Sequence, residues 1–332
     1  MKFNLLFWVR MATVAIPGFF SIPLAYYGMS YWALVAGTLI GQAAQVIVLW
    51  KISAWRPSFM FSNYIAKEMG RFGSWVGLTG LLSWFYVWAD SLFVGSYLGT
   101  HELGLYRTGN QFVTMIFGFL FGPILPVLYS HFSGIQTDVD RLRDVMFRVL
   151  RIIAFIAIPL AFVLYALDEP ISTVVFGQKW EGIAFVLGVM ALMQAYSWVV
   201  GANGEIYRAI GKPSYETIVT LTCLGIYLIG YFISIQHGFK SFVWTRFFLA
   251  FGAMFLHIGF GWLAVKLNVI SVLKVIALAT LIGIIAMLVK IPVAKVSDNA
   301  FIQILLVGGA SGILMLASIY LLERKGAVAD LI

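Results

Sequence analysis

Apolar runs of about 20 residues recur along the whole chain, and they limit its fold more than any other feature. A helix of that length crosses the hydrocarbon core of a bilayer. Short polar breaks separate one run from the next. We therefore predict ten spans, at Leu5–Gly28, Tyr31–Trp50, Ser74–Leu98, Asn110–Tyr129, Ile152–Leu167, Ile183–Ala202, Thr217–Ile235, Val243–Val265, Val272–Lys290 and Ala300–Leu322.

The composition agrees with a membrane protein and favours helices. Apolar residues make up 61% of the chain and charged residues only 11%, against about 25% charged residues in a globular domain. Backbone polar groups must be satisfied within the bilayer, and the alternation typical of barrel strands does not occur. The predicted fold class is an all-α polytopic membrane protein with about ten transmembrane helices.

One carboxylate, Asp90, lies inside the third span. An ionisable group in hydrocarbon costs roughly 2.5–3.5 kcal/mol on insertion scales, so it usually faces the protein interior or a watery cavity. Asp90 is therefore a candidate for a polar substrate cavity. The alternative is that it pairs with a neighbouring helix and holds the bundle together.

Local patterns add four expectations. We expect a turn at Gly99–Gly109, followed by a helix that Pro123 and Pro126 kink. Apolar residues from Leu142 to Leu150 recur at helical spacing opposite basic residues, which predicts a helix on the membrane surface before the fifth span. Small residues at four-residue intervals from Ala33 let the second span approach another helix closely, and we expect that helix to be absent from this chain.

The charge distribution predicts an orientation. With the N-terminus inside, 16 of the 22 Lys and Arg residues lie on the cytoplasmic side, as the positive-inside rule requires. Both termini are then cytoplasmic. The basic break from Lys51 to Gly73 becomes a cytoplasmic linker between two helical lobes. The net charge of +8 reflects this bias and gives no indication of a nucleic-acid partner.

The sequence contains little that suggests an enzyme. Its four histidines lie in separate breaks or spans at no metal-ligand spacing, and there is no phosphate-binding glycine loop or nucleophile elbow. Asp168, Glu169 and Glu181 form a weak acidic group that loop solvation explains better. We therefore predict no enzyme activity, catalytic residue, metal ligand or cofactor.

Six collinear segments carry a resemblance to a known family. They read YYGMSYWALVAG, WRPSFMF, ADSLFVGSYLGTHELGLYRTG, ILPVLYSHFSGIQTDVDRLR, PISTVVFGQKWEGIA and YRAIGKP, and cover Tyr26 to about Pro213. In this order they resemble the polysaccharide flippase family of the multidrug/oligosaccharidyl-lipid/polysaccharide exporter superfamily. The resemblance implies a MATE-like architecture of two six-helix lobes and a terminal helix pair.

Members of that family usually have fourteen spans, so this chain resembles a member without its first four helices. The resemblance implies that residues 1–51 hold the last two helices of the N-terminal lobe and that 52–73 form the interlobe linker. Residues 74–266 are then the six-helix C-terminal lobe, and 267–332 are the terminal helix pair and tail. The first lobe is incomplete in this arrangement, so we expect that the chain cannot transport its substrate alone.

The resemblance also implies a function: the translocation of a polyprenyl-pyrophosphate-linked oligosaccharide across the cytoplasmic (inner) membrane for cell-surface polysaccharide biosynthesis, by alternating access. Membrane lipids, a polysaccharide polymerase and export machinery are the implied partners. Such a substrate needs cationic groups in a cavity, and arginine binds phosphate through two bonds at once. The candidate cavity residues are Arg10, Arg71, Asp90, Arg208 and Arg246. For each arginine the alternative is snorkelling to the nearest headgroups.

Three other functions stay open. A drug or cation antiporter of the same superfamily would use a carboxylate such as Asp90 for ion coupling. A membrane glycan polymerase or ligase would be an enzyme, but usually has a large outer loop that this chain lacks. The third is an inactive remnant of a truncated gene.

Overall fold

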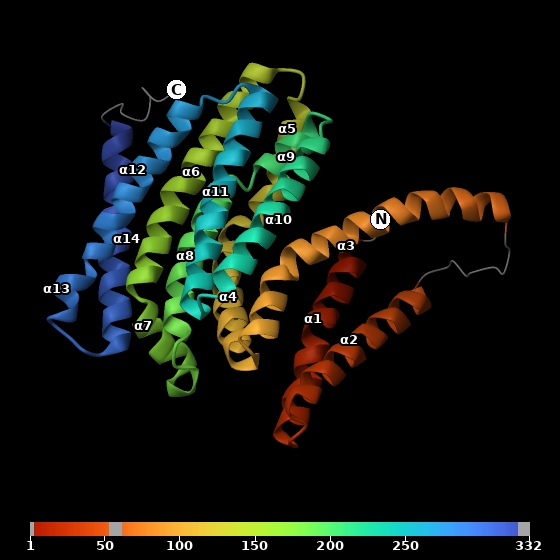
Figure 1. The fold of residues 1–332 in the computed structure, drawn as a ribbon, viewed down its shortest axis with the longest axis horizontal. Coiled ribbons are helices and arrows are strands. Elements are labelled where there is room, and N and C mark those ends of the chain that lie inside the picture. The colour runs from red at the N-terminus through yellow and green to blue at the C-terminus, as the bar shows by residue number, and fades with distance from the viewer. Residues whose placement is uncertain (1–2, 53–61, 325–332) are drawn as a thin grey trace. The chain divides into compact units, whose positions relative to one another are not determined.

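The computed structural model describes residues 3–52 and 62–324, and in these residues every regular element is a helix. The chain divides into two compact units, Met1–Val76 and Gly77–Ile332, which are described separately. The bulk of the second unit is a bundle of long helices (Figure 1). The predicted all-helical fold class is confirmed.

The first unit contains a hairpin of α1 (Phe3–Tyr26) and α2 (Ser30–Ile52). Glycines on α2 let the two backbones approach closely. A Cβ atom at Gly37 would lie 2.8 Å from the Pro17 carbonyl oxygen, and one at Gly41 would lie 2.6 Å from Pro17 Cγ. The expected close packing of small residues therefore occurs. The expectation that their partner is absent is wrong, because α1, joined to α2 by a short turn, covers this face.

Helix α3 (Asn63–Tyr97) begins in the first unit and ends in the second. The predicted linker 52–73 is thus helical from residue 63 onward, and residues 53–61 lie outside the described part. At 1.5 Å per residue, its 35 residues extend about 50 Å, more than the roughly 30 Å of a hydrocarbon core. The division into lobes at this linker stays a prediction.

A bent helix pair opens the second unit after α3. Helix α4 (Thr100–Phe121) and helix α5 (Ile124–Gly134) meet at 43°, so the predicted proline kink is confirmed. The predicted turn at Gly99–Gly109 is wrong, because α4 begins directly after Gly99. That glycine has a φ of +103°, which L side chains rarely adopt, and it completes the reversal within one or two residues.

Helix α6 (Val139–Ala166) is one continuous helix of 28 residues. The predicted separate surface segment is therefore wrong. Leu142, Met146 and Leu150 are at most 3% exposed, and the first turn is capped by Asp138, whose carboxylate accepts a hydrogen bond from the Arg141 backbone N–H at 3.0 Å. The apolar face that suggested a membrane-surface helix is buried against other helices of the bundle.

The remaining elements are the other long helices of the bundle and the short helices and turns that connect them. They are α7 (Asp168–Ile171), a π-helical turn η1 (Ser172–Phe176), a 3₁₀ turn η2 (Gln178–Trp180), α8 (Ile183–Val199), α9 (Asn203–Ala209), α10 (Ser214–Ile235), α11 (Phe239–Val265), α12 (Val269–Leu288), α13 (Lys290–Ala294) and α14 (Ala300–Arg324). The polar break predicted after the sixth span is partly helical, since α9 occupies its first half.

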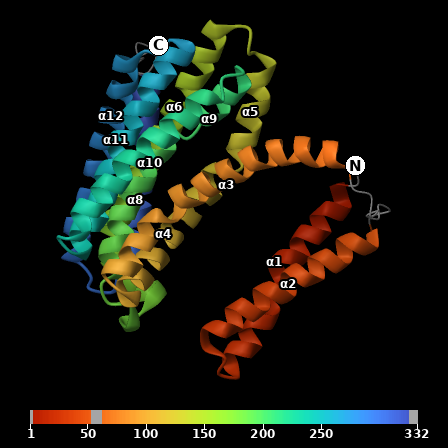
Figure 2. The same cartoon turned by 45° about the vertical axis from the view of Figure 1, so that its right-hand side comes forward.

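Helix α8 is the centre of the second unit. It packs against α4, α6 and α11, while α6 also packs on α12 and α11 on α10 (Figures 1 and 2). Of the most apolar stretch of the span Ile183–Ala209, 72% is buried, against 17% for α14. Helix α14 lies at the edge, where the Ser311 hydroxyl donates to the Ala286 carbonyl of α12 at 3.0 Å.

Each predicted span overlaps a helix or a bent helix pair, although α3 and α6 begin well before the third and fifth predicted spans. Among the described residues, seven helices are long and apolar enough to cross a membrane, or eight if α4 and α5 are counted as one span. Helices α1 and α3, which coincide with the first and third predicted spans, contain side chains outside the described part. The chain is a multi-pass helical membrane protein.

Candidate functional site

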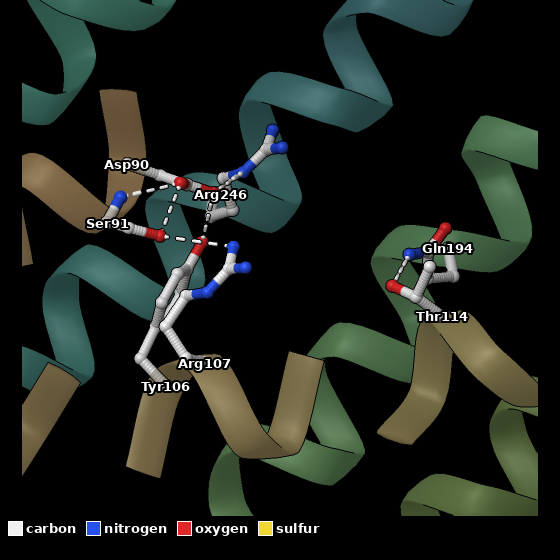
Figure 3. A network of polar contacts seen from close by, with 7 residues as sticks. All are labelled: Asp90, Ser91, Tyr106, Arg107, Thr114, Gln194 and Arg246. Carbon is white, nitrogen blue, oxygen red and sulfur yellow. Dashed lines mark hydrogen bonds and ion pairs between the residues drawn. The ribbon is translucent and has the colours of Figure 1, made fainter. Parts of the chain in front are cut away.

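The Asp90 carboxylate lies on α3 and is 2% exposed. Three neutral groups donate hydrogen bonds to it: the Ser91 backbone N–H at 2.6 Å, the Ser91 hydroxyl at 3.0 Å and the Tyr106 hydroxyl of α4 at 2.7 Å (Figure 3). Hydrogen bonds to a carboxylate are among the strong ones in proteins. Asp90 is therefore well satisfied by α3 and α4 alone.

Arg246 of α11 contacts the same carboxylate. Its Nε donates to Asp90 Oδ2 at 3.3 Å, and its side chain is 14% exposed. The guanidinium also lies over the rings of Tyr227 and Tyr231, at 5.1 and 5.9 Å from their centroids. Figure 3 shows the two terminal nitrogens of Arg246 directed away from Asp90. Among the described residues no acceptor other than Asp90 is found for the Arg246 guanidinium, so its terminal nitrogens can bind a further anion.

A second arginine, Arg107 of α4, lies beside this pair. Its Nη1 donates to the Ser91 hydroxyl at 3.4 Å, and its guanidinium lies 4.0 Å from the centroid of the Trp88 ring (Figure 3). Sequence analysis missed Arg107 because it placed the residue in a turn. A prediction that began the helix directly after Gly99 would have placed Arg107 two turns inside that helix.

These groups line a cavity of about 400 Å³ within the second unit. Residues from α3, α4, α8, α10 and α11 form its wall: Tyr86, Val87, Asp90, Arg107, Asn110, Gln111, Thr114, Met193, Gln194, Ser197, Tyr227 and Arg246. Two arginines and one aspartate give the wall a net positive charge. A cavity of this kind, inside an apolar bundle, suits an anionic ligand.

The structure brings together two of the five predicted site residues, Asp90 and Arg246. Asp90 pairs with another helix and also lines the cavity, and its role toward a substrate stays a prediction. Arg208 lies elsewhere, on α9, with its Nη2 2.6 Å from a Glu205 oxygen and its Nε 3.8 Å from a Glu216 oxygen. The side chains of Arg10 and Arg71 lie outside the described residues.

A second cavity, of about 910 Å³, lies at the connection between α6 and α8, and Lys240 forms part of its wall. The acidic group that we attributed to loop solvation, Asp168, Glu169 and Glu181, lines it. Burial raises the pKa of the Asp168 carboxyl, while the Glu169 backbone N–H and Lys290 oppose that rise. Asp168 is therefore not simply a solvated loop residue.

Comparison with known proteins identifies the family of the chain. The sequence profile of the family described as polysaccharide biosynthesis protein matches residues 1–185, which is more than half of the chain. The chain belongs to this family.

The sequence identity between the chain and individual proteins is low. The chain is 23% identical to the teichuronic acid biosynthesis protein TuaB of Bacillus subtilis over 62% of its own length and 43% of TuaB. It is 24% identical to the succinoglycan biosynthesis transport protein ExoT of Rhizobium meliloti, over 55% of the chain and 37% of ExoT. For the lipopolysaccharide biosynthesis protein WzxC of Escherichia coli the identity is 25%, over 55% and 36%.

The chain therefore spans about two fifths of the length of these curated relatives. None of the three names describes a catalytic activity.

Among solved structures, the chain is similar to the lipid II flippase MurJ in an inward closed conformation, with a TM-score of 0.77 and 17% identity. The similarity covers 96% of this chain and 68% of MurJ. At this identity it shows the fold alone.

Proposed function

We propose that this protein translocates a polyprenyl-pyrophosphate-linked oligosaccharide across the cytoplasmic membrane for cell-surface polysaccharide biosynthesis. The observation that carries the proposal is the pair of arginines, Arg107 and Arg246, held at the wall of a cavity within an apolar helical bundle. The names of the relatives, which include a transport protein of succinoglycan biosynthesis, support the choice of substrate.

The arginine pair has the chemistry that a pyrophosphate requires. A guanidinium is planar, stays protonated and can donate two parallel hydrogen bonds to a phosphate group. Asp90 engages only the Nε of Arg246 at 3.3 Å, and this contact orients the fork. Asp90 is thus a positioning residue that also lowers the cost of burying Arg246 without a ligand.

Transport adds a requirement for two lobes that expose the cavity alternately. In this proposal residues 1–51 belong to the first lobe, 74–266 to the second and 267–332 to a terminal pair, with both termini in the cytoplasm. Arg10 and Arg71 remain candidates for phosphate contact from the first part of the chain. A polysaccharide polymerase and export machinery are the proposed partners that use the translocated lipid.

The proposal is tested by the binding of polyprenyl pyrophosphate to the purified full chain in lipid nanodiscs. Replacing Arg246 with glutamine removes the net contribution of one charge-assisted hydrogen bond, about 1.5–3 kcal/mol, so we expect affinity to fall roughly 10- to 100-fold. Arg246→Lys should recover only part of this loss, because lysine cannot donate bidentately.

Arg208→Gln is the matched control, since Arg208 carries the same charge but is paired with two glutamates away from the cavity. It should bind like the unaltered protein. Equal affinity of the Arg246→Gln and unaltered proteins for polyprenyl pyrophosphate would refute the proposed site.

A further inference from the structure

The cavity wall has two chemically different ends. Its charged side chains, Asp90, Arg107 and Arg246, gather at one end, and Thr114 with Gln194 lie apart from them (Figure 3). The rest of the hydrogen-bonding wall is uncharged and also includes Tyr86 and Tyr227. We name the part on α4 and α8 the polar strip; its members are Asn110, Gln111 and Thr114 of α4 and Gln194 and Ser197 of α8.

The spacing of these residues makes the strip continuous with the charged end. Arg107, Gln111 and Thr114 follow the i, i+4, i+7 pattern, so they share one face of α4. Seven residues of helix cover about 10 Å. On α8, Gln194 and Ser197 are three residues apart, and the Gln194 amide donates a hydrogen bond to the Thr114 hydroxyl across the two helices.

Part of the hydrogen-bonding capacity of the strip is unused. Within the described part of the chain, the buried side-chain oxygen of Asn110 has no partner. Gln194 donates its amide N–H to Thr114, and no hydrogen bond to its side-chain oxygen is found among the described residues. The Ser197 hydroxyl, in contrast, donates to the Met193 carbonyl within α8 at 2.9 Å. Polar side chains are expensive within an apolar span and usually mark a functional path. A row of them facing a cavity requires an explanation beyond the packing of α4 against α8.

We infer that the polar strip is the subsite for the sugar next to the pyrophosphate. This inference rests on the proposed function and deepens it. Amide and hydroxyl groups can both donate and accept hydrogen bonds, as sugar hydroxyls can. A further phosphate would need cations, which the strip lacks. The strip continues directly from Arg107 along α4, so a sugar bonded to a phosphate at the arginine pair lies against it.

The test compares lipids that differ only in the sugar. The full chain in nanodiscs is titrated with polyprenyl pyrophosphate and with the same lipid carrying one glucose, galactose or N-acetylglucosamine. We expect at least one sugar-bearing lipid to bind about tenfold more tightly than the bare lipid, as one or two net hydrogen bonds would give. Gln111→Leu and Thr114→Val should each remove most of this preference, measured as the ratio of the affinities for the sugar-bearing and the bare lipid.

Two further variants make the result specific. Thr108→Val changes the same residue type on the same helix outside the cavity wall, and it should keep the full preference. Thr114→Ser retains the hydroxyl and should keep it as well, which separates hydrogen bonding from a loss of folding.

The two proposals fail in different ways. If the bare lipid does not bind, or binds independently of Arg246, the proposed function fails. If the bare lipid binds through Arg246 but no sugar is preferred, the sugar subsite alone is wrong. A preference that survives both Gln111→Leu and Thr114→Val would also overturn the subsite.

Discussion

Arg246 and Arg208 each lie beside carboxylates, yet their surroundings differ. Arg208 is paired with Glu205, three residues away on the same helix turn, and its side chain is 45% exposed. Arg246 meets Asp90 from a helix 156 residues further along the chain, and its side chain is 14% exposed. A guanidinium and a carboxylate thus form a local, half-exposed pair in one region, with Arg208 45% and Glu205 14% exposed, and a buried pair between helices in the other. Only the buried pair lines the cavity.

The largest expected effect is the loss of Asp90. Asp90→Leu leaves the Arg246 guanidinium buried without its counter-charge, which costs about 3–5 kcal/mol in folding free energy. Glu205→Leu removes one carboxylate from an exposed arginine, and exposed pairs contribute about 0–1 kcal/mol. Denaturant unfolding of both variants in detergent measures the contrast. Equal destabilisation by the two substitutions would mean that burial does not distinguish the pairs.

A smaller effect is expected from Tyr106, whose hydroxyl donates to Asp90 at 2.7 Å. Tyr106→Phe removes a hydrogen bond to a charged acceptor, which contributes about 1.5–3 kcal/mol. Tyr215→Phe is a suitable control, because no hydrogen bond of its hydroxyl is found within the described residues. The same unfolding measurement applies. If Tyr106→Phe were as stable as the control, the donors of Ser91 alone would suffice for Asp90.

The smallest effect concerns a third carboxylate, Asp168, in the second cavity. Burial raises its folded-state pKa above the unfolded value. The folded state therefore holds the proton more tightly, and stability falls as pH rises from the unfolded value of about 3.9 through the folded pKa. Asp168→Asn should remove this part of the pH dependence and slightly stabilise the protein at neutral pH. Thermal unfolding between pH 4 and pH 7 tests it, and an unchanged pH profile would contradict the expected cost of burial.

Sequence patterns predicted the spans well because each apolar run reports on its own segment. The helices at Leu5–Gly28 or Val243–Val265 need no knowledge of their neighbours. Pairings between distant segments are different. Asp90 and Arg246 were each recognised as unusual, but their contact depends on how α3 and α11 pack, and no local periodicity encodes this.

The wrong predictions have two origins, one in the packing of distant segments and one in local turn geometry. The face around Leu142 is apolar because it packs against other helices, and a single segment cannot show whether lipid or protein covers it. Arg107 was missed because a polar stretch following Gly99 was taken for a longer turn. A glycine that reverses the chain in one or two residues allows the next helix to begin at once, so polar residues after it can lie two turns inside a helix.

The hydrogen bonds that Ser91 and Tyr106 donate to Asp90 affect how fast an anion can bind at the cavity wall. The donors of Ser91 and Tyr106 hold the carboxylate, the carboxylate holds the Nε of Arg246, and the terminal nitrogens of Arg246 already point away from Asp90 (Figure 3). Binding an anion there requires no collective helix movement, which takes microseconds to milliseconds. Capture of an anion at this wall can therefore be complete long before any helix has shifted.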